Sequence, residues 1–416
     1  MLVNVEICQR EANDYAPADY VVATNQYTLR SRTQTLSKVT VPDDADALTI
    51  DKSNASYVTV SNANLSLRFK ADGTLQSWTT DGLDLIKAGG GPEYENYRWI
   101  ENDAPYGVDP AYDSDNGITA KTATFTISTD KRTATATVKA AGRNCNYTFV
   151  YTIYANGVVD LKASYTAQTG NLRRIGMQMR LPGEFANVSY YARGPWANYI
   201  DRKTGSFLGR YTSTVWDMNE YFLRPQTMGN RQDLRELKLT DDKGHGVQVQ
   251  TSGEVAFSTL YWSDQQLKQK QHNWELTIPD NVTNRTVYAH FDYRQKGLGN
   301  GSCGPGTISE YLLPSSGTYT YTLRFTPLTG GTTGIGQTAT ADRLSVTHTD
   351  DEVAVSGAIA AGTKIALYNL GGVRLATASA TASAQRLSLP LGTHPRGAYI
   401  LQIETPDGQR THKFVK

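Results

Sequence analysis

One ten-residue segment groups side chains that could bind a sugar. Residues 193–202 carry an indole, an amide, a phenol, a carboxylate and a guanidinium, on Trp196, Asn198, Tyr199, Asp201 and Arg202. Aromatic rings stack on the faces of pyranoses, while amide and charged groups bind their hydroxyls. The same residues could instead form a buried network that holds one corner of a β-sandwich, because charged pairs are often structural. The sequence favours the structural interpretation and leaves the sugar site open.

A second polar loop offers contacts of the same kind. Trp99, Glu101, Asn102 and Asp103 follow the end of a predicted strand, and a proline and a glycine come soon after them. In many proteins the residues that bind a ligand lie on loops that a rigid scaffold positions. The alternative is an Asx turn, in which the side chains satisfy their own backbone. The sequence does not separate the two.

A glycine-rich segment, residues 297–305, contains Asn300 and Cys303. It has too many glycines for a strand, so its backbone either approaches a ligand closely or simply turns. We favour the first interpretation and count Asn300 and Cys303 among the candidate carbohydrate-binding residues.

Composition limits the partners. The chain has 41 Lys and Arg against 40 Asp and Glu, a net charge of +1, so nucleic acid and anionic lipid are poor candidates and an uncharged glycan fits better. No apolar stretch reaches the length of about 18 residues that a membrane-spanning helix needs. Cys8, Cys145 and Cys303 lack the paired spacing of a zinc site or a disulfide framework. We therefore expect no metal and no cofactor.

The elements that must position these residues are strands. Segments with β-branched or aromatic residues in alternation predict half-buried strands, at 57–60, 65–69, 123–127, 147–151 and 319–323. Asx-Gly pairs at 72–73, 81–82, 156–157 and 407–408 predict tight hairpin turns. One helix is predicted over 264–271, with Ser263 and Gln266 as its capping box. The fold class is all-β and antiparallel, without the strand and helix alternation of a (β/α)₈ barrel.

Composition also divides the chain. The Gly/Thr-rich segment 329–340 predicts a linker, followed over 341–416 by a small immunoglobulin-like β-sandwich. Residues 1–40 hold one or two strands without enough sequence for their own core, and we interpret them as the remnant of an immunoglobulin-like β-sandwich domain.

Five segments resemble the C-terminal domain of glycoside hydrolase family 2 β-galactosidases. Residues 193–202 are similar to its GPxENYxDR signature and 224–235 to PQENGNRxDVR; segments 272–276 and 288–299 follow in the family's order, and 91–103 precedes them where the family reads WR-PTDND. The resemblance covers 45–328. It implies a large antiparallel super-sandwich of the galactose mutarotase type, which packs against a barrel-bearing catalytic segment or subunit and lends loops to the rim of its active site.

In that family both catalytic glutamates come from the barrel, so we assign no catalytic residue to this chain and expect it to be inactive alone. The chain is expected to be the non-barrel portion of an enzyme that hydrolyses terminal β-D-galactosides.

Two departures from the family's sequence pattern affect the rim. Relatives place a sugar-stacking Trp near Cys303, and Thr227 stands where the signature has Glu.

The tail resembles a type IX secretion sorting domain, through residues 364–372, 396–403 and 413–416. That resemblance implies a periplasmic, cell-surface or secreted protein of a Gram-negative bacterium. No export signal opens the chain, so we expect it to be the C-terminal part of a longer polypeptide or one chain of a split enzyme. A homo-oligomer is left open.

Two other functions stay in view. One is a stand-alone carbohydrate-binding module. The other is a mutarotase-like aldose epimerase, in which a His and a carboxylate exchange protons at an anomeric centre. The candidates for that chemistry are His245, His272 and His290, each of which we interpret as a structural residue or a helix-end cation.

Overall fold

The computed structural model describes residues 1–31, 35–103, 117–169, 172–301, 304–329, 344–369, 373–405 and 408–416. These residues form an all-β protein with antiparallel sheets, which confirms the predicted fold class. The chain divides into two compact units, residues 1–330 and 331–416. Among the described residues, none of the helices is both long and apolar enough to cross a membrane.

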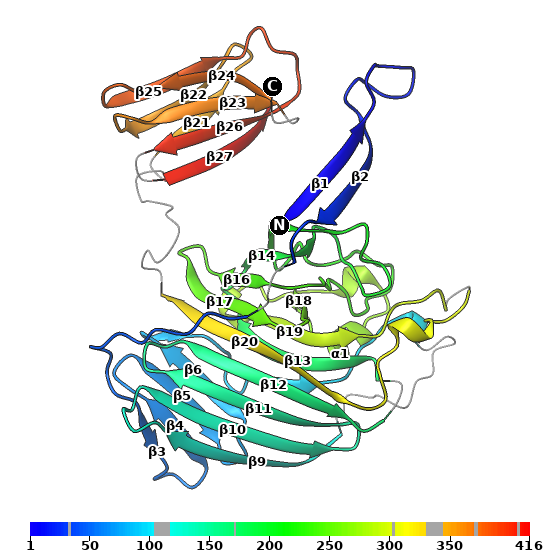
Figure 1. Cartoon of the computed structure of the whole chain (residues 1–416), viewed down its shortest axis with the longest axis vertical. Coiled ribbons are helices and arrows are strands. Elements are labelled where there is room, and N and C mark those ends of the chain that lie inside the picture. The colour runs from blue at the N-terminus through cyan, green and yellow to red at the C-terminus, as the bar shows by residue number, and fades with distance from the viewer. Residues whose placement is uncertain are drawn as a thin grey trace. The chain divides into compact units, whose positions relative to one another are not determined.

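The first unit is built on a nine-stranded sheet (Figure 1). Its strands, in spatial order, are β15 (Phe207–Thr214), β14 (Asn187–Gly194), β16 (Glu236–Thr240), β17 (His245–Ser252), β20 (Thr318–Thr329), β12 (Val159–Ala167), β11 (Cys145–Tyr154), β10 (Thr133–Gly142) and β9 (Ile118–Ile127). Side chains along β10 to β12 alternate between buried and accessible, as sheets with one wet face require.

Two smaller sheets cover the buried face. One has five strands, β3 (Thr49–Asp51), β4 (Tyr57–Ser61), β5 (Leu65–Lys70), β6 (Leu75–Thr80) and β7 (Leu83–Asp84). The other has four, β18 (Ala256–Leu260), β19 (Thr286–Gln295), β13 (Arg174–Pro182) and β8 (Glu93–Glu95). Aromatic rings join the layers edge to face: Trp78 of β6 and Phe291 of β19 both meet Phe325 of β20, at 5.7 and 6.1 Å. The unit is therefore a large sandwich.

The predicted local structure is largely confirmed. All five predicted strands are present, as parts of β4, β5, β9, β11 and β20. Gly73, Gly82 and Gly157 have the positive φ of their predicted turns. The fourth turn, Asp407-Gly408, lies partly outside the described residues.

The predicted helix is shorter than expected. The capping box of Ser263 and Gln266 is present, but α1 spans Asp264–Lys268 rather than 264–271. Leu267 is buried, whereas the residues that follow it are at least partly exposed. A short helix is stable in water only where an apolar face packs against the protein. Leu267 is the last buried residue of this segment, and the helix ends one residue after it.

The second unit is a small sandwich with its own core. A three-stranded sheet holds β21 (Ser345–His348), β22 (Glu352–Ile359) and β25 (Ala384–Pro390), and a four-stranded sheet holds β24 (Arg374–Ser379), β23 (Lys364–Asn369), β26 (Ala398–Thr405) and β27 (Gly408–Val415). Val353, Leu367 and Leu401 are buried between the two sheets.

The N-terminal segment is a hairpin of β1 (Leu2–Cys8) and β2 (Val21–Thr28), which form a two-stranded sheet. Most of its side chains are exposed. The Gln26 amide joins it to the edge strand β15, since it donates to the Leu208 carbonyl and accepts from the Leu208 N–H, both at 2.9 Å.

Candidate carbohydrate-binding rim

Three loops that the sequence singled out meet in the first unit. They are residues 99–103 after β8, residues 194–202 after β14, and residues 296–301 after β19, and we call them together the rim. Thr227 joins the first two, because its hydroxyl accepts from the Trp99 N–H at 2.8 Å and its carbonyl lies 3.5 Å from the Tyr199 hydroxyl. Contacts of Asp201 and Arg202 with Gly299 join the second and third.

Asp201 and Arg202 fix the backbone of the third loop. Asp201 Oδ2 accepts from the Gly299 N–H at 2.8 Å, and Arg202 Nη2 donates to the Gly299 carbonyl at 2.9 Å. Gly299 has φ +61°, and a Cβ at Gly297 would lie 2.8 Å from Asp201 Cγ, so glycine is required where the loop passes this carboxylate. The loop then presents Asn300 to solvent. Asp201 and Arg202 therefore position the third loop, and these contacts already occupy their side chains.

Asn198 and Tyr199 are structural. Asn198 is fully buried; its Nδ2 donates to the Arg193 and Trp196 carbonyls, and its Oδ1 accepts from the Gln232 N–H. Tyr199 is buried too. Trp196, by contrast, is 73% exposed, so it is the member of this segment whose ring is accessible for stacking on a ligand.

Trp99 closes the base of the rim. The residue is 9% exposed, its Nε1 donates to the Pro225 carbonyl at 3.2 Å, and the Arg224 guanidinium lies 5.2 Å from the ring centroid. Arg224 also donates to Glu101 Oε1 at 2.8 Å. Because Glu101 is exposed, its carboxylate can contact a ligand. Thr227, at the position where the signature has Glu, helps to hold Trp99 in place because its hydroxyl accepts from the Trp99 N–H.

Asp103 belongs to a buried ion network. Arg98 donates to both of its carboxylate oxygens, at 2.7 and 2.8 Å, and Lys296 lies 3.5 Å away. Burial opposes ionisation of Asp103, but Arg98, Lys296 and Arg173 outweigh it and hold its pKa below the ordinary value. The network ties the first loop to the third, because Arg98 also donates to the Lys296 carbonyl.

Two candidates cannot be placed. Asn102 lies in the short helix η1 (Glu101–Asp103), but its side chain is outside what the structure describes. Cys303 lies outside the described residues, as does the segment 104–116 that continues the first loop.

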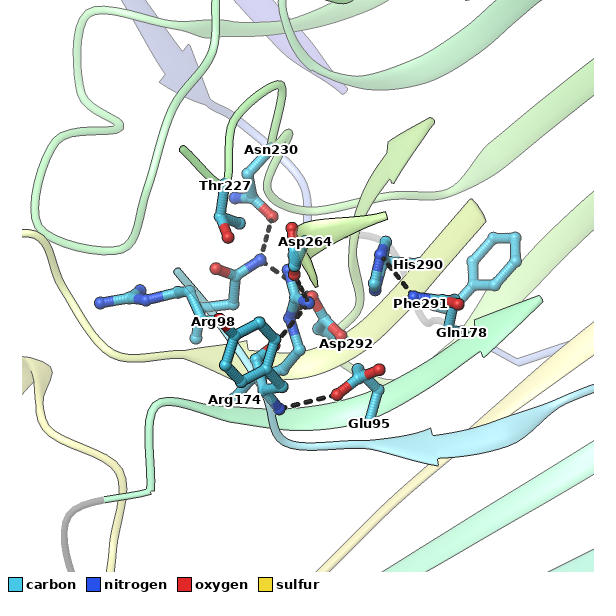
Figure 2. Close-up of polar contacts among 12 residues, drawn as sticks. Glu95, Arg98, Arg174, Gln178, Thr227, Asn230, Asp264, His290, Phe291 and Asp292 are labelled. Carbon is cyan, nitrogen blue, oxygen red and sulfur yellow. Dashed lines mark hydrogen bonds and ion pairs between the residues drawn. The ribbon is translucent and has the colours of Figure 1, made fainter. Parts of the chain in front are cut away.

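The sequence analysis missed a second buried cluster, which Figure 2 shows around Arg174. Arg174 at the start of β13 donates to Asp264 Oδ2 at 2.6 Å, and its Nε lies 3.1 Å from Asp292 Oδ2. Glu95 of β8 is the third carboxyl of the group. Gly176 leaves room for the Asp292 carboxylate, because a Cβ there would lie 2.1 Å from Asp292 Oδ1. The signal that could have revealed this cluster was Asp292, an aspartate between Phe291 and Tyr293 within a strand.

The three carboxyls of this cluster share one cation. Burial raises the pKa of Glu95 to about 8 and that of Asp292 to about 6, although Arg174 pulls both downward. At neutral pH the cluster therefore keeps a proton on Glu95. All three side chains are at least 94% buried, so they are closed to a sugar in this structure and act as a support for the surrounding loops.

The three histidines have structural partners. His290 of β19 lies beside Gln178, and burial holds its pKa well below the ordinary value, so it is neutral. His245 pairs with Asp241 in a turn at 2.8 Å, and His272 pairs with Glu275 at 2.9 Å.

Comparison with known proteins finds relatives of this chain among β-galactosidases. Residues 61–325 match the family model described as the β-galactosidase small chain. The β-galactosidase of Priestia megaterium is 28% identical over 325 residues, which cover 76% of this chain and 30% of the relative. A Bifidobacterium adolescentis β-galactosidase, BgaC, is 34% identical over 167 residues, 38% of this chain and 15% of the relative.

Among solved structures, a galactose 1-epimerase from Lactobacillus acidophilus aligns with 65% of this chain and 94% of its own, at 13% identity and a TM-score of 0.39. The chain spans about a third of the length of the first curated relatives. The family match covers more than half of the chain and includes the segments that form the rim, so the chain belongs to the β-galactosidase small-chain family.

Proposed function

We propose that this chain forms the non-barrel part of a family 2 β-galactosidase and supplies rim loops to an active site whose catalytic glutamates lie on a barrel-bearing segment. The family match over residues 61–325 is the observation that carries the proposal. The convergence of the three loops supports it, because it gathers Trp196, Glu101 and Asn300 at accessible positions. These three are the proposed sugar contacts; Cys303 and Asn102 stay candidates.

The buried carboxyls argue against hydrolysis by this chain alone. A retaining glycosidase needs two carboxyls about 5–5.5 Å apart that both reach the sugar. Glu95, Asp264 and Asp292 are close together but buried from solvent.

The test is release of nitrophenol from nitrophenyl-β-galactoside. We expect the chain alone to be inactive, and activity to appear when a barrel-bearing β-galactosidase segment that lacks its own small-chain region is added. Turnover by the isolated chain that is lost on Glu101→Gln would refute the proposal, and so would an inactive mixture of stably associated chains.

For location, we propose export to the periplasm, cell surface or medium of a Gram-negative bacterium, directed by residues 341–416 acting as a sorting domain. Support comes from the sequence resemblance and from the separate core of the second unit. Fractionation of cells with type IX secretion tests it, when they express the chain behind an N-terminal export signal with and without these residues. The shortened chain should stay in the periplasm, and equal release of both to the surface or medium would refute the proposal.

A stand-alone carbohydrate-binding module is the second candidate, favoured by the exposed ring of Trp196. Calorimetry with galactosides separates the two, since a module binds without a barrel segment and a rim donor does not.

A further inference from the structure

Four large apolar or aromatic side chains are exposed on two loops beside the rim. Tyr221, Leu223 and Trp274 are 70, 87 and 74% exposed, and Phe222 is 42% exposed. We call these four residues the aromatic patch. Grouped apolar side chains of this size are uncommon on a surface that faces only water, and they mark interaction sites.

The aromatic patch is ordered by specific contacts. The Asn273 N–H donates to the Leu223 carbonyl at 3.1 Å, which joins the two loops that form the patch. The Trp274 ring stacks on His272 with centroids 4.3 Å apart and planes 11° apart, and Glu275 holds that imidazole. A side chain fixed before binding loses less conformational entropy on association. The patch is thus a prearranged surface.

The aromatic patch borders the rim. Leu223 directly precedes Arg224, which pairs with Glu101 and covers the Trp99 ring. An apolar centre with charged residues at its margin is the usual composition of a protein interface.

We propose that the aromatic patch is the docking surface for the catalytic segment that carries the barrel. This inference rests on the function proposed above and locates its interface. A protein fits better than a glycan, because Leu223 has the most exposed side chain of the four yet no group that can bind a sugar hydroxyl. His272 already occupies one face of the Trp274 indole. The matched region is about 30% of the first relative's length, so most of such an enzyme lies outside it and is available as the occupant.

Docking at this place has a consequence for the rim. A segment seated on Leu223 and Trp274 would meet the rim where Arg224 and Glu101 lie, and the sugar site would form along the seam between the two. Substitutions in the aromatic patch would therefore weaken assembly, although the patch itself does not contact the substrate.

Binding of the full chain to a defined probe tests the proposal. The probe is the Priestia megaterium β-galactosidase without the region that this chain matches, immobilised for interferometry. We expect Leu223→Ser and Trp274→Ala each to weaken binding at least tenfold, and amides of residues 221–223 and 272–274 to gain protection from hydrogen exchange in the complex. Val373→Ser is the matched control, because Val373 is an apolar residue, 58% exposed, in the second unit.

The outcomes separate this inference from the proposed function. Absence of binding by the unchanged chain would overturn both. Equal binding by the unchanged chain and by Leu223→Ser and Trp274→Ala would overturn the docking surface alone. Loss of galactoside binding in Trp274→Ala, with unchanged binding of the probe, would overturn it too and assign the patch to a glycan. Thermal unfolding should be the same in all variants, since the replaced side chains are exposed.

Discussion

At the scale of single residues, exposure separates side chains that can contact a ligand from those that hold the loops. Trp196 and Asn198 are two positions apart in one motif, yet the first is 73% exposed and the second fully buried. Their chemistry alone could not assign these tasks, because an amide binds a backbone carbonyl and a sugar hydroxyl equally well.

The accessible indole of Trp196 gives the first prediction. Trp196→Ala should raise the KM of the assembled enzyme for nitrophenyl-β-galactoside by about three- to tenfold, as loss of a stacking contact worth about 1 kcal/mol implies. Its unfolding temperature should not change, because the ring is mostly in water. Trp196→Phe, which keeps an aromatic face, is the control. An unchanged KM in Trp196→Ala would remove this residue from the sugar site.

Glu95 gives a prediction on pH. Its pKa is about 8 in the folded protein and 4.5 ordinarily, so the folded state holds a proton that the unfolded state releases. Stability from this group is therefore complete below about pH 4.5 and falls as the pH rises towards 8, by up to about 5 kcal/mol. Glu95→Gln cannot ionise and can still accept from the Tyr97 N–H, as Glu95 Oε1 does at 2.8 Å.

Urea unfolding at pH 5, 6, 7 and 8 measures this effect. The unchanged chain should lose stability across the series more steeply than Glu95→Gln. Asp292 contributes a further decline that both share, in the window between its ordinary value of 3.8 and about 6. Parallel curves for the two proteins would contradict the assignment of the proton to Glu95.

At the scale of elements, the loops of the rim depend on one another. Asp201 of the second loop accepts from Gly299 of the third, and Arg98, next to the first loop, donates to the carbonyl of Lys296 in the third. These contacts between loops act together with backbone hydrogen bonds, such as that from the Gly297 N–H to the Tyr311 carbonyl, to fix the loop conformations.

Asp201→Ala tests this dependence. The variant leaves the Gly299 N–H without its acceptor, which costs about 1–3 kcal/mol in local stability. Hydrogen exchange at residues 297–301 should therefore speed up by at least fivefold. Asp201→Asn keeps an acceptor oxygen at the same position and should exchange more slowly than Asp201→Ala. Identical exchange in the two variants would contradict this role of the Asp201 carboxylate.

At the scale of the molecule, two apolar cores imply two folding units. Phe325 and its aromatic neighbours lie in the core of residues 1–330, whereas Val353, Leu367 and Leu401 form another in residues 331–416. Domains with separate cores unfold independently when little surface joins them.

Calorimetry should therefore record two transitions for the full chain. Removal of residues 331–416 should abolish one of them and leave the midpoint of the other within about 2 °C, a change that corresponds to about 1.4 kcal/mol for a domain of this size. A single transition that shifts as a whole after the truncation would show that the two cores are coupled.

The sequence by itself determined the all-β class, the five predicted strands, the hairpin turns and the family, because alternation and turn residues act over a few neighbours. It also identified the segments that form the rim. Only the tertiary structure separated exposed Trp196 from buried Asn198 and ended α1 at Lys268. It alone assembled Arg174, Asp264 and Asp292 from three separate segments. Burial and long-range charge pairing decide those features, and both depend on which distant strands lie together.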